Sequence, residues 1–262
     1  MIYVGTSGFS YDDWVGPFYP EGLAPYLWLP YYARHFKACE LNFTYYRQPD
    51  RSTLKGLARR VPKDFLFTVK AYQGITHSRE ATDADFREFL KGIEPLAQEG
   101  KLGCILAQFP YSFAPSRENR EYLKVLREKM PELPVVIEFR NARWLTKETF
   151  DFLRENDLGF CCVDEPPLKG LIPPIAEATS NVAYVRFHGR NKEKWWEHEE
   201  AWERYDYTYS REELEEWVPK IGYLQERARI VFAFANNHWR GQAVDTARLL
   251  RDLLREEGYQ VV

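Results

Sequence analysis

The sequence predicts a single α/β domain folded as a (β/α)8 TIM-type barrel, and three observations support this prediction. Short apolar runs recur along the chain, each ends on a polar or charged residue, and a helix-like stretch follows. Around eight such units are present, and strands that alternate with helices favour parallel pairing through right-handed crossovers. The length of 262 residues also suits one barrel, for which roughly 250 residues is typical. No Pro-, Gly- or Ser-rich stretch divides the chain, so residues 1–262 are expected to form one domain. An open doubly wound sheet is the structural alternative.

The expected strands are short apolar segments. They cover residues 2–7, a segment ending at residue 42, and residues 65–70, 102–109, 134–139, 159–163, 181–187 and 229–235. Helical patterning covers residues 25–36, 83–98 and 242–257. Three further helices are expected to begin after the capping residues Asp50, Ser116 and Thr146. Another begins at Ser210, which forms a capping box with Glu213 and starts a helix reaching about residue 227. The sixth unit is expected to be irregular, because Pro173 and Pro174 interrupt it.

Charge and hydropathy exclude several classes of protein. The net charge of −3 argues against broad binding to phosphate backbones, which needs a surplus of Lys and Arg. No apolar run approaches the ~20 residues that span a bilayer, so no membrane association is expected. The chain starts with a strand-like run rather than a basic segment and long apolar core, so we expect no signal peptide. Its four cysteines lie in apolar runs without metal-site spacing, which is typical of reduced thiols in a cytoplasmic protein.

The polar residues that end the strands are the candidates for chemistry. In TIM barrels the active site lies where the strands end, so these side chains should converge at one mouth. Glu40 and Glu138 are the best candidates for general acid/base catalysis, since a carboxylate in a partly apolar mouth can have its pKa raised toward the working pH. His188 is the third catalytic candidate, because an imidazole titrates near neutrality.

The remaining strand-end residues are expected to bind a ligand. Lys70 and Arg186 suit a phosphate or carboxylate, and so do the backbone N–H groups and hydroxyls of the turn at residues 5–8. Asn236 and Asn237 offer donors and acceptors for sugar hydroxyls or base edges. The full set of predicted substrate-binding residues is Ser7, Tyr11, Trp14, Asn42, Lys70, His77, Gln108, Arg140, Asp164, Arg186, Arg190, Tyr207, Asn236 and Asn237.

The segment at residues 189–209 combines aromatic rings with cations. Trp195, Trp196, Trp202, Tyr205, Tyr207 and Tyr209 lie among Arg190, Lys192 and Lys194. Such a pattern suits stacking on bases or sugars. Five glutamates in the same segment would repel a long phosphate backbone. We therefore favour a lid over a small or short polymeric ligand, with an aromatic mini-core that holds the loop as the alternative.

A metal site is a further alternative. Glu138, Asp164 and His188 follow successive strands and could form a triad for a hard or borderline metal. The chain has five histidines and no H-x-x-H, H-E-x-x-H or C-x-x-C pattern. No cofactor is therefore expected, and a divalent metal stays open.

Several motifs resemble the YecE-like family, known as domain of unknown function 72. The motifs that carry the resemblance are Gly5-Thr6-Ser7-Gly8-Phe9-Ser10-Tyr11, Glu40-Leu41-Asn42-Phe43-Thr44-Tyr45-Tyr46, Gln108-Phe109-Pro110, Ile137-Glu138-Phe139-Arg140, Arg186-Phe187-His188-Gly189-Arg190 and Asn236-Asn237. They cover nearly the whole chain in the expected order. The resemblance implies a β/α-barrel fold, and the family has no settled activity. A likeness to metal-dependent apurinic endonuclease barrels would imply a trinuclear zinc site, for which this sequence lacks the His-rich ligand set.

Three functional hypotheses follow from the sequence. The leading one is an enzyme that acts at the barrel mouth on a phosphorylated, sugar-like or nucleotide-containing ligand by carboxylate/His acid–base chemistry, with hydrolysis among the candidate reactions. The second is a non-catalytic protein that binds nucleic acid or a nucleotide through the aromatic segment. The third is a metal-dependent isomerase, lyase or phosphodiesterase. The sequence leaves the oligomeric state open.

Overall fold

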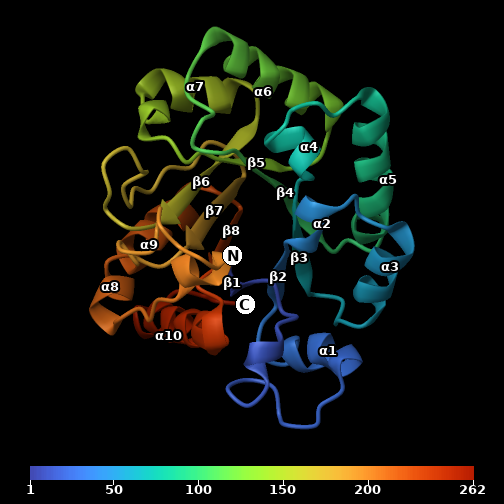
Figure 1. Cartoon of the computed structure of the whole chain (residues 1–262), viewed down its shortest axis with the longest axis vertical. Helices are drawn as coiled ribbons and strands as arrows, with labels where there is room; N and C mark the ends of the chain where they lie inside the picture. Colours follow the sequence, from blue (N-terminus) through green and yellow to red (C-terminus); the bar gives the residue numbers. More distant parts are fainter.

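Eight parallel strands close into a barrel, as the sequence predicts, and the computed structural model describes all residues from 1 to 262 (Figure 1). The strands follow one another around the barrel in chain order, and β8 pairs with β1 to close it. They are β1 (Ile2–Ser7), β2 (Ala38–Leu41), β3 (Leu66–Lys70), β4 (Leu102–Gln108), β5 (Val135–Glu138), β6 (Leu158–Asp164), β7 (Val182–Phe187) and β8 (Ile230–Ala235).

Helices connect the strands and surround the barrel (Figure 1). They are α1 (Trp28–Tyr32), α2 (Phe43–Tyr46), α3 (Arg51–Arg59), α4 (Gln73–Thr76), α5 (Asp83–Gln98), α6 (Arg117–Lys129), α7 (Lys147–Glu155), α8 (Arg211–Glu215), α9 (Val218–Arg227) and α10 (Gln242–Glu256). None of them is long and apolar enough to cross a bilayer.

The predicted capping residues begin their helices. The side chains of Asp50, Ser116 and Thr146 each accept a backbone N–H in the first turn of α3, α6 and α7. Ser210 and Glu213 form the expected capping box at α8. Each cap satisfies N–H groups that the first turn of a helix leaves without a partner, so helix starts could be read from the sequence.

Two predicted helices differ from the structure. The segment at 25–36 contains only a 3₁₀ turn, η2 (Pro25–Leu27), and the short α1, because Pro30 lacks a backbone N–H that a continuous helix over 25–36 would need. The helix expected from Ser210 to about residue 227 is two helices, α8 and α9. Pro219 lies in the first turn of α9, where its missing N–H has no intrahelical partner to lose.

The sixth unit is irregular, as expected, and has no helix at all. The chain from Asp164 to Val182 crosses from β6 to β7 as turns and extended backbone around Pro173 and Pro174. On the way it returns to the mouth, where the Ile172 N–H donates to the Glu165 carboxylate at 2.9 Å. The crossover therefore contributes to the mouth rather than only covering the outside of the sheet.

Strand alternation decides which polar groups lie inside the barrel. Tyr184, Arg186 and His188 are two residues apart along β7 and its extension, so they share one face of the strand. All three are buried, and the Tyr184 hydroxyl contacts Thr68 Oγ1 of β3 across the barrel at 2.7 Å. The interior face of β7 is therefore polar, which is costly unless every group is paired.

Candidate active site

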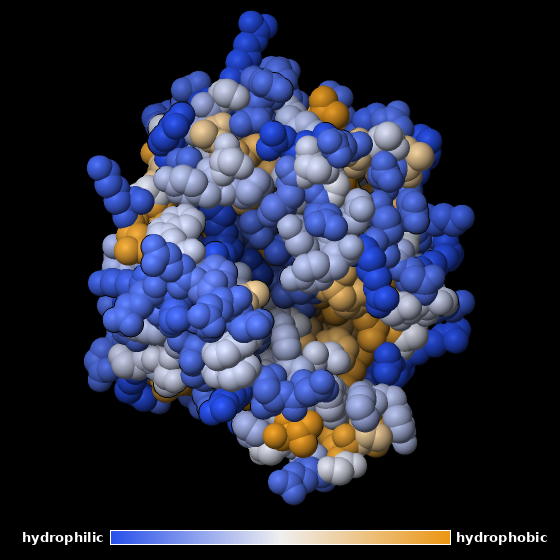
Figure 2. Space-filling view, in the orientation of Figure 1, coloured by the Kyte–Doolittle hydropathy of each residue, from blue (hydrophilic) through white to orange (hydrophobic).

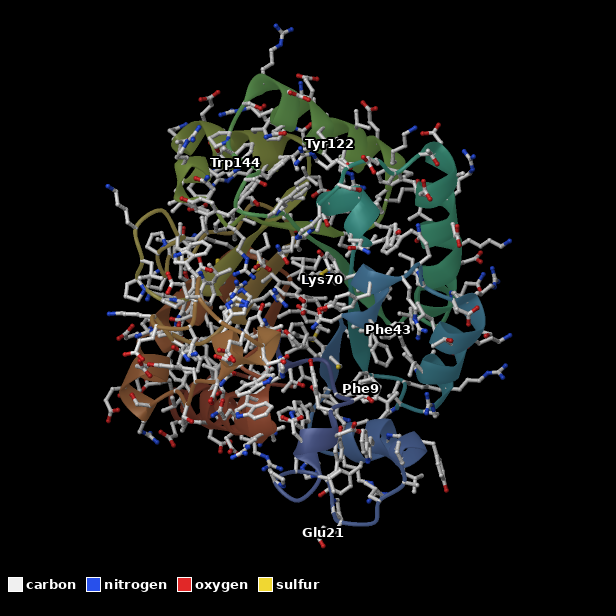
Figure 3. All side chains as sticks on the ribbon, viewed as in Figure 1. Phe9, Glu21, Phe43, Lys70, Tyr122 and Trp144 are labelled. Atoms are coloured by element: carbon white, nitrogen blue, oxygen red, sulfur yellow. The ribbon has the colours of Figure 1, made fainter.

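Two adjoining cavities open at the end of the barrel where the strands finish. Their volumes are about 340 Å³ and 210 Å³, and both are lined by Tyr46, Lys70, Arg140 and Tyr205. Figure 2 shows the hollow at the centre of the molecule as a hydrophilic recess, and Figure 3 places Lys70 over the same region. The active-site position that the barrel fold predicts is therefore a real depression.

The larger cavity lies under the aromatic segment, and the smaller one lies toward β1 and β8. The further residues lining the larger cavity are Tyr45, His77, Gln108, Pro110, Tyr111, Leu171, Trp195, Trp196 and Arg204. Those of the smaller cavity are Tyr11, Asn42, Arg186, Asn236 and His238. No Asp or Glu lines either cavity.

A buried chain of ion pairs supports the floor of these cavities. Arg186 bridges two carboxylates, with Nη2 2.6 Å from Glu40 Oε1 and Nη1 2.8 Å from Glu138 Oε2. Arg140 continues the chain, with Nη2 2.9 Å from Glu138 Oε1 and Nη1 2.9 Å from Glu165 Oε2. The carboxylates thus face guanidinium groups, and the remaining surface of the two arginines faces the cavities. This arrangement leaves positive groups toward the cavities.

Glu138 is held ionised by its neighbours. Burial by itself would raise the pKa of its carboxyl, but Arg186, Arg140 and His188 together hold that pKa well below its usual range. Both carboxylate oxygens are engaged, and the side chain has no exposed surface. Glu40 is likewise buried, and it accepts from the Tyr184 hydroxyl at 2.7 Å. Neither carboxylate lines a cavity.

His188 is a neutral bridge between Glu138 and Asn236. Its Nε2 lies 3.0 Å from Glu138 Oε1, and its Nδ1 lies 3.0 Å from the Asn236 Nδ2. With the amide nitrogen donating to Nδ1, the imidazole proton is on Nε2 and is donated to Glu138. Burial, followed by the charge of Arg140, lowers the pKa of His188 well below its ordinary value. The ring therefore orients Glu138 and Asn236 without adding charge.

Two cations at the mouth have no acidic partner. The Lys70 Nζ makes no hydrogen bond or ion pair, and it lies 4.4 Å from the centre of the Tyr45 ring. Arg204 packs its guanidinium 5.3 Å from the centre of the Trp195 ring, and its buried Nε has no hydrogen-bond partner. A buried unpaired donor such as the Arg204 Nε is rare in proteins, because leaving one without a partner costs roughly 1–3 kcal/mol. Both groups line the larger cavity.

The aromatic segment after β7 serves both as a wall of the cavity and as a packed loop. Trp196 is 53% exposed and meets Tyr111 edge-on at 5.5 Å, so these two rings from different loops flank the larger cavity. Trp195 beside it is buried. Trp202 instead stacks on Trp239 at 3.7 Å, away from the cavity lining. Part of the segment therefore lines the cavity, and part of it forms an aromatic mini-core; the lid over a ligand stays a prediction.

Asp164 fastens the base of this loop. Its carboxylate accepts two bonds from Arg190, at 2.9 and 2.7 Å, and one each from Tyr209 at 2.6 Å and Trp217 at 2.7 Å. Gly189 supports the same turn with a φ of +89°, and a Cβ there would lie 2.7 Å from Tyr207 Cβ. The carboxylate is thus committed to loop structure. Asp164 does not converge with Glu138 and His188, and no group of three or more His, Cys, Asp or Glu side chains is arranged to hold a metal ion.

The predicted substrate-binding residues fall into three groups. Those that line a cavity are Tyr11, Asn42, Lys70, His77, Gln108, Arg140, Arg186 and Asn236. Ser7 and Trp14 lie beneath the surface, where Ser7 Oγ is 3.5 Å from Arg186 Nη2 and Trp14 Nε1 donates to the His238 carbonyl at 2.8 Å. Those that hold the loop, outside both cavities, are Asp164, Arg190, Tyr207 and Asn237. The ligand-binding role given to the last four residues has no support in the geometry.

Several cavity residues were not singled out as binding residues from the sequence. They are Tyr45, Tyr46, Tyr111, Leu171, Arg204 and His238. Tyr45 and Tyr46 lie on the short helix α2 directly after β2, which periodicity could not reveal because it has only four residues. His238 carried a readable signal, since it follows the Asn236-Asn237 pair at the end of β8. Its ring stacks on Tyr11 at 4.8 Å.

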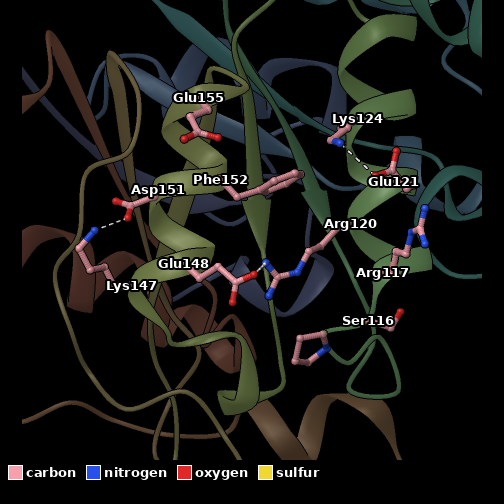
Figure 4. A pocket seen from close by; sticks show the side chains of 11 residues that line it. Ser116, Arg117, Arg120, Glu121, Lys124, Lys147, Glu148, Asp151, Phe152 and Glu155 are labelled. Carbon is pink, nitrogen blue, oxygen red and sulfur yellow. Dashed lines mark hydrogen bonds and ion pairs between the residues drawn. The ribbon is translucent and has the colours of Figure 1, made fainter.

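A larger open cavity of about 970 Å³ lies outside the barrel between α6 and α7 (Figure 4). Six of its charged side chains are paired locally: Arg120 with Glu148, Lys124 with Glu121, and Lys147 with Asp151. Exposed pairs of this kind are ordinary features of helix surfaces. The barrel mouth is therefore the stronger candidate despite its smaller volume.

Comparison with known proteins agrees with this architecture. The chain matches the profile of "Protein of unknown function DUF72" over residues 3–261. It is 34% identical to UPF0759 protein YunF of Bacillus subtilis, over 97% of this chain and 95% of that protein. It is 30% identical to UPF0759 protein YecE of Escherichia coli, over 84% of this chain and 81% of that protein. The crystal structure of a DUF72 family protein from Thermotoga maritima superposes with a TM-score of 0.90 and 44% identity, covering 97% of this chain and 99% of the other. The chain therefore belongs to the DUF72 family.

Proposed function

We propose that this protein is an enzyme that binds a small anionic ligand at the C-terminal mouth of its barrel. The proposal rests on the positive charge of the cavity lining. The basic side chains that line the two cavities are Lys70, Arg140, Arg186 and Arg204, and no carboxylate lines either one. A phosphorylated, sugar-like or nucleotide-containing compound fits this chemistry, because guanidinium groups bind phosphate oxygens in pairs. The aromatic rings of Tyr46, Tyr111 and Trp196 would pack against a sugar or base.

Arg204 is the main candidate for contact with the anion. It has a free guanidinium, whereas Arg140 and Arg186 already pair with buried carboxylates. Those two arginines would present their remaining donors to the ligand in orientations that the ion-pair chain determines. Such preorganisation lowers the cost of ordering side chains on binding.

We propose that three buried groups act mainly as positioning residues: Glu40, Glu138 and His188. Each is completely buried, and none lines a cavity. Proton transfer by Glu138 would require its pKa to rise toward neutrality, whereas its arginine neighbours hold the pKa well below the usual range. We therefore assign the three groups to orienting Arg186, Arg140 and Asn236. Direct acid–base catalysis by these three groups stays a prediction from the sequence.

Binding of matched ligand pairs by isothermal titration calorimetry tests the proposal. The pairs are glucose 6-phosphate with glucose, and AMP with adenosine, so that each pair differs only in the phosphate. We expect the phosphorylated member to bind at least about 10-fold more tightly, since a charge-assisted hydrogen bond contributes about 1.5–3 kcal/mol. Arg204→Gln should weaken that binding, while Arg117→Gln on the outer face of α6 should leave it unchanged. Equal affinity for both members of every pair would contradict an anion site.

A nucleic-acid ligand is the second proposal, favoured by the exposed Trp196 beside Tyr111. Bases stack on such rings with little dependence on sequence. A single-stranded 12-mer that competes with AMP, with an affinity that falls steeply with salt, would favour this alternative. A mononucleotide that binds as well as the 12-mer would favour the small-ligand proposal.

A metal is not part of the proposal. The oxygens of Glu40 and Glu138 are already hydrogen-bonded to guanidinium, hydroxyl or imidazole groups, and Asp164 points to the loop. A divalent cation would have to displace arginines to obtain ligands. We also propose a cytoplasmic location, which the four buried free cysteines support.

A further inference from the structure

Lys70 is the one amine among the cations of the site, and like Arg204 it has no acidic partner in the protein. It ends β3, lines both cavities, and its Nζ makes no hydrogen bond or ion pair. The nearest carboxylates that could serve it, Glu40 and Glu138, are bound by Arg186 instead. The amine therefore opens onto the two cavities without a partner from the protein.

The surroundings of Lys70 favour its uncharged form. Burial is the largest cause, the positive charges of Arg186 and Arg140 add to it, and Glu138 and Glu40 oppose it. Together these groups lower the pKa of the Lys70 amine to about 7. His77 lines the same cavity, and burial together with the nearby Lys70 lowers its own pKa to about 4. At neutral pH a large fraction of Lys70 is therefore a free amine.

An uncharged amine binds anions weakly, but it is a good nucleophile. The arginines supply permanent positive charge to the same cavity. Lysines that are desolvated, or placed beside other cations, are activated for Schiff-base chemistry. Arg140 and Arg186, which line the smaller cavity together with Lys70, place other cations beside the amine.

We propose that Lys70 is a nucleophile that forms an imine with the carbonyl carbon of an anionic aldehyde, ketone or 2-oxo acid, whose anionic group is held by Arg140 and Arg204. This inference rests on the proposed anion site and adds the substrate class and the reacting atom. It makes the enzyme a candidate lyase, isomerase or dehydratase that uses a covalent intermediate.

The step balances without any oxidant or reductant. The lone pair of the Lys70 Nζ forms a bond to the carbonyl carbon while the C=O π electrons move to the oxygen. The nitrogen loses a proton and the oxygen gains one, which produces a neutral carbinolamine. A proton taken up from the solvent protonates that hydroxyl, which leaves as water, and the nitrogen lone pair forms the C=N bond of a protonated imine. The net change is one carbonyl, one amine and one proton converted to one iminium ion and one water.

Pyridoxal 5′-phosphate and pyridoxal form the matched pair of probes. Both are aldehydes that form imines with lysine, and only the first carries a phosphate. We expect sodium borohydride to trap the phosphate-bearing probe on Lys70 at substoichiometric concentration, as found by peptide mapping of the intact wild-type protein. Pyridoxal should label Lys70 at least about 10-fold less, and inorganic phosphate should compete with the phosphate-bearing probe. The rate of trapping at Lys70 should rise with pH to half its maximum near pH 7, in accordance with its pKa of about 7.

Two variants make the test specific. Lys70→Arg should remove the preferred label, whereas Lys192→Arg, an exposed lysine on the loop after β7, should leave it in place. Circular dichroism checks that both variants fold, and the mapping of the wild-type protein stands without them. Labelling that is spread over exposed lysines with no preference for Lys70 would overturn the inference. If phosphate binding persists in calorimetry while Lys70 stays unlabelled, only the imine inference fails. If phosphate does not bind at all, the proposed anion site fails as well.

Discussion

Arg186 donates from Nη1 to Glu138 Oε2 at 2.8 Å, with both side chains buried inside the barrel. The pair joins β7 to β5 through the interior of the barrel. A buried ion pair contributes little to stability as a whole, because desolvation offsets the attraction, but removing one partner leaves a charge without compensation.

Glu138→Gln should destabilise the protein strongly. The change leaves Arg186 and Arg140 facing a neutral amide in a buried site, and breaking a buried pair in this way costs about 3–5 kcal/mol. Urea unfolding followed by circular dichroism measures the loss. Glu148→Gln is the matched control, because Glu148 forms an exposed pair with Arg120 and should cost no more than about 1 kcal/mol. Equal losses in the two variants would show that the interior network does not hold the barrel mouth.

Lys70→Met should increase the free energy of unfolding near pH 7, and this gain over the wild-type protein should be smaller at high pH. The folded-state pKa of Lys70 is about 7, below the ordinary lysine value of about 10.4. Between these values the unfolded chain binds more protons than the folded chain, so the wild-type protein gains stability as pH rises. The variant lacks this titration. The gap between the two free energies of unfolding should therefore be constant below about pH 7 and narrow toward pH 10. A gap that does not depend on pH would mean that the Lys70 amine is charged throughout this range.

Trp196→Ala and Trp195→Ala should separate ligand binding from stability. Trp196 is 53% exposed at the cavity, so its removal should weaken ligand binding and change the free energy of unfolding by less than about 1 kcal/mol. Trp195 is 2% exposed, and truncating it should cost about 3–5 kcal/mol. Calorimetric binding and urea unfolding of both variants provide the two readouts. A reversed pattern would mean that the exposed ring is the structural one.

Asp164→Asn should loosen the segment at residues 189–210. An amide cannot accept all four bonds that Arg190, Tyr209 and Trp217 now donate, and its loss of charge leaves Arg190 with only its more exposed partners. Hydrogen exchange should accelerate in this segment while exchange in β1–β5 is unchanged. Asp151→Asn serves as the control, because that carboxylate pairs with Lys147 and Arg154 on the surface of α7. Unchanged exchange in the Asp164 variant would mean that other contacts fasten the loop.

Sequence patterns predicted the helix caps, the irregular sixth unit and most strand ends, because these depend on interactions between near neighbours. Asp50 and Ser210 cap helices that begin within three residues of them. The mouth residues could be named for a related reason, since a barrel brings its strand ends together whatever the detailed packing. The roles within that group could not be assigned, because Lys70 and Glu138 look equally available in a linear chain.

The sequence by itself determined the barrel, the residues at its mouth and the aromatic segment above it, because hydrophobic periodicity and capping are local properties. Only the tertiary structure decided which charged side chains pair with one another. It paired Arg186 with Glu40 and Glu138, committed Asp164 to Arg190, and left Lys70 and Arg204 without acids. The physical reason is that pKa values and free charge depend on burial and on partners more than 40 residues away in the chain. The proposed binding of an anionic ligand at the mouth follows from this pairing, because it leaves two basic side chains without acidic partners.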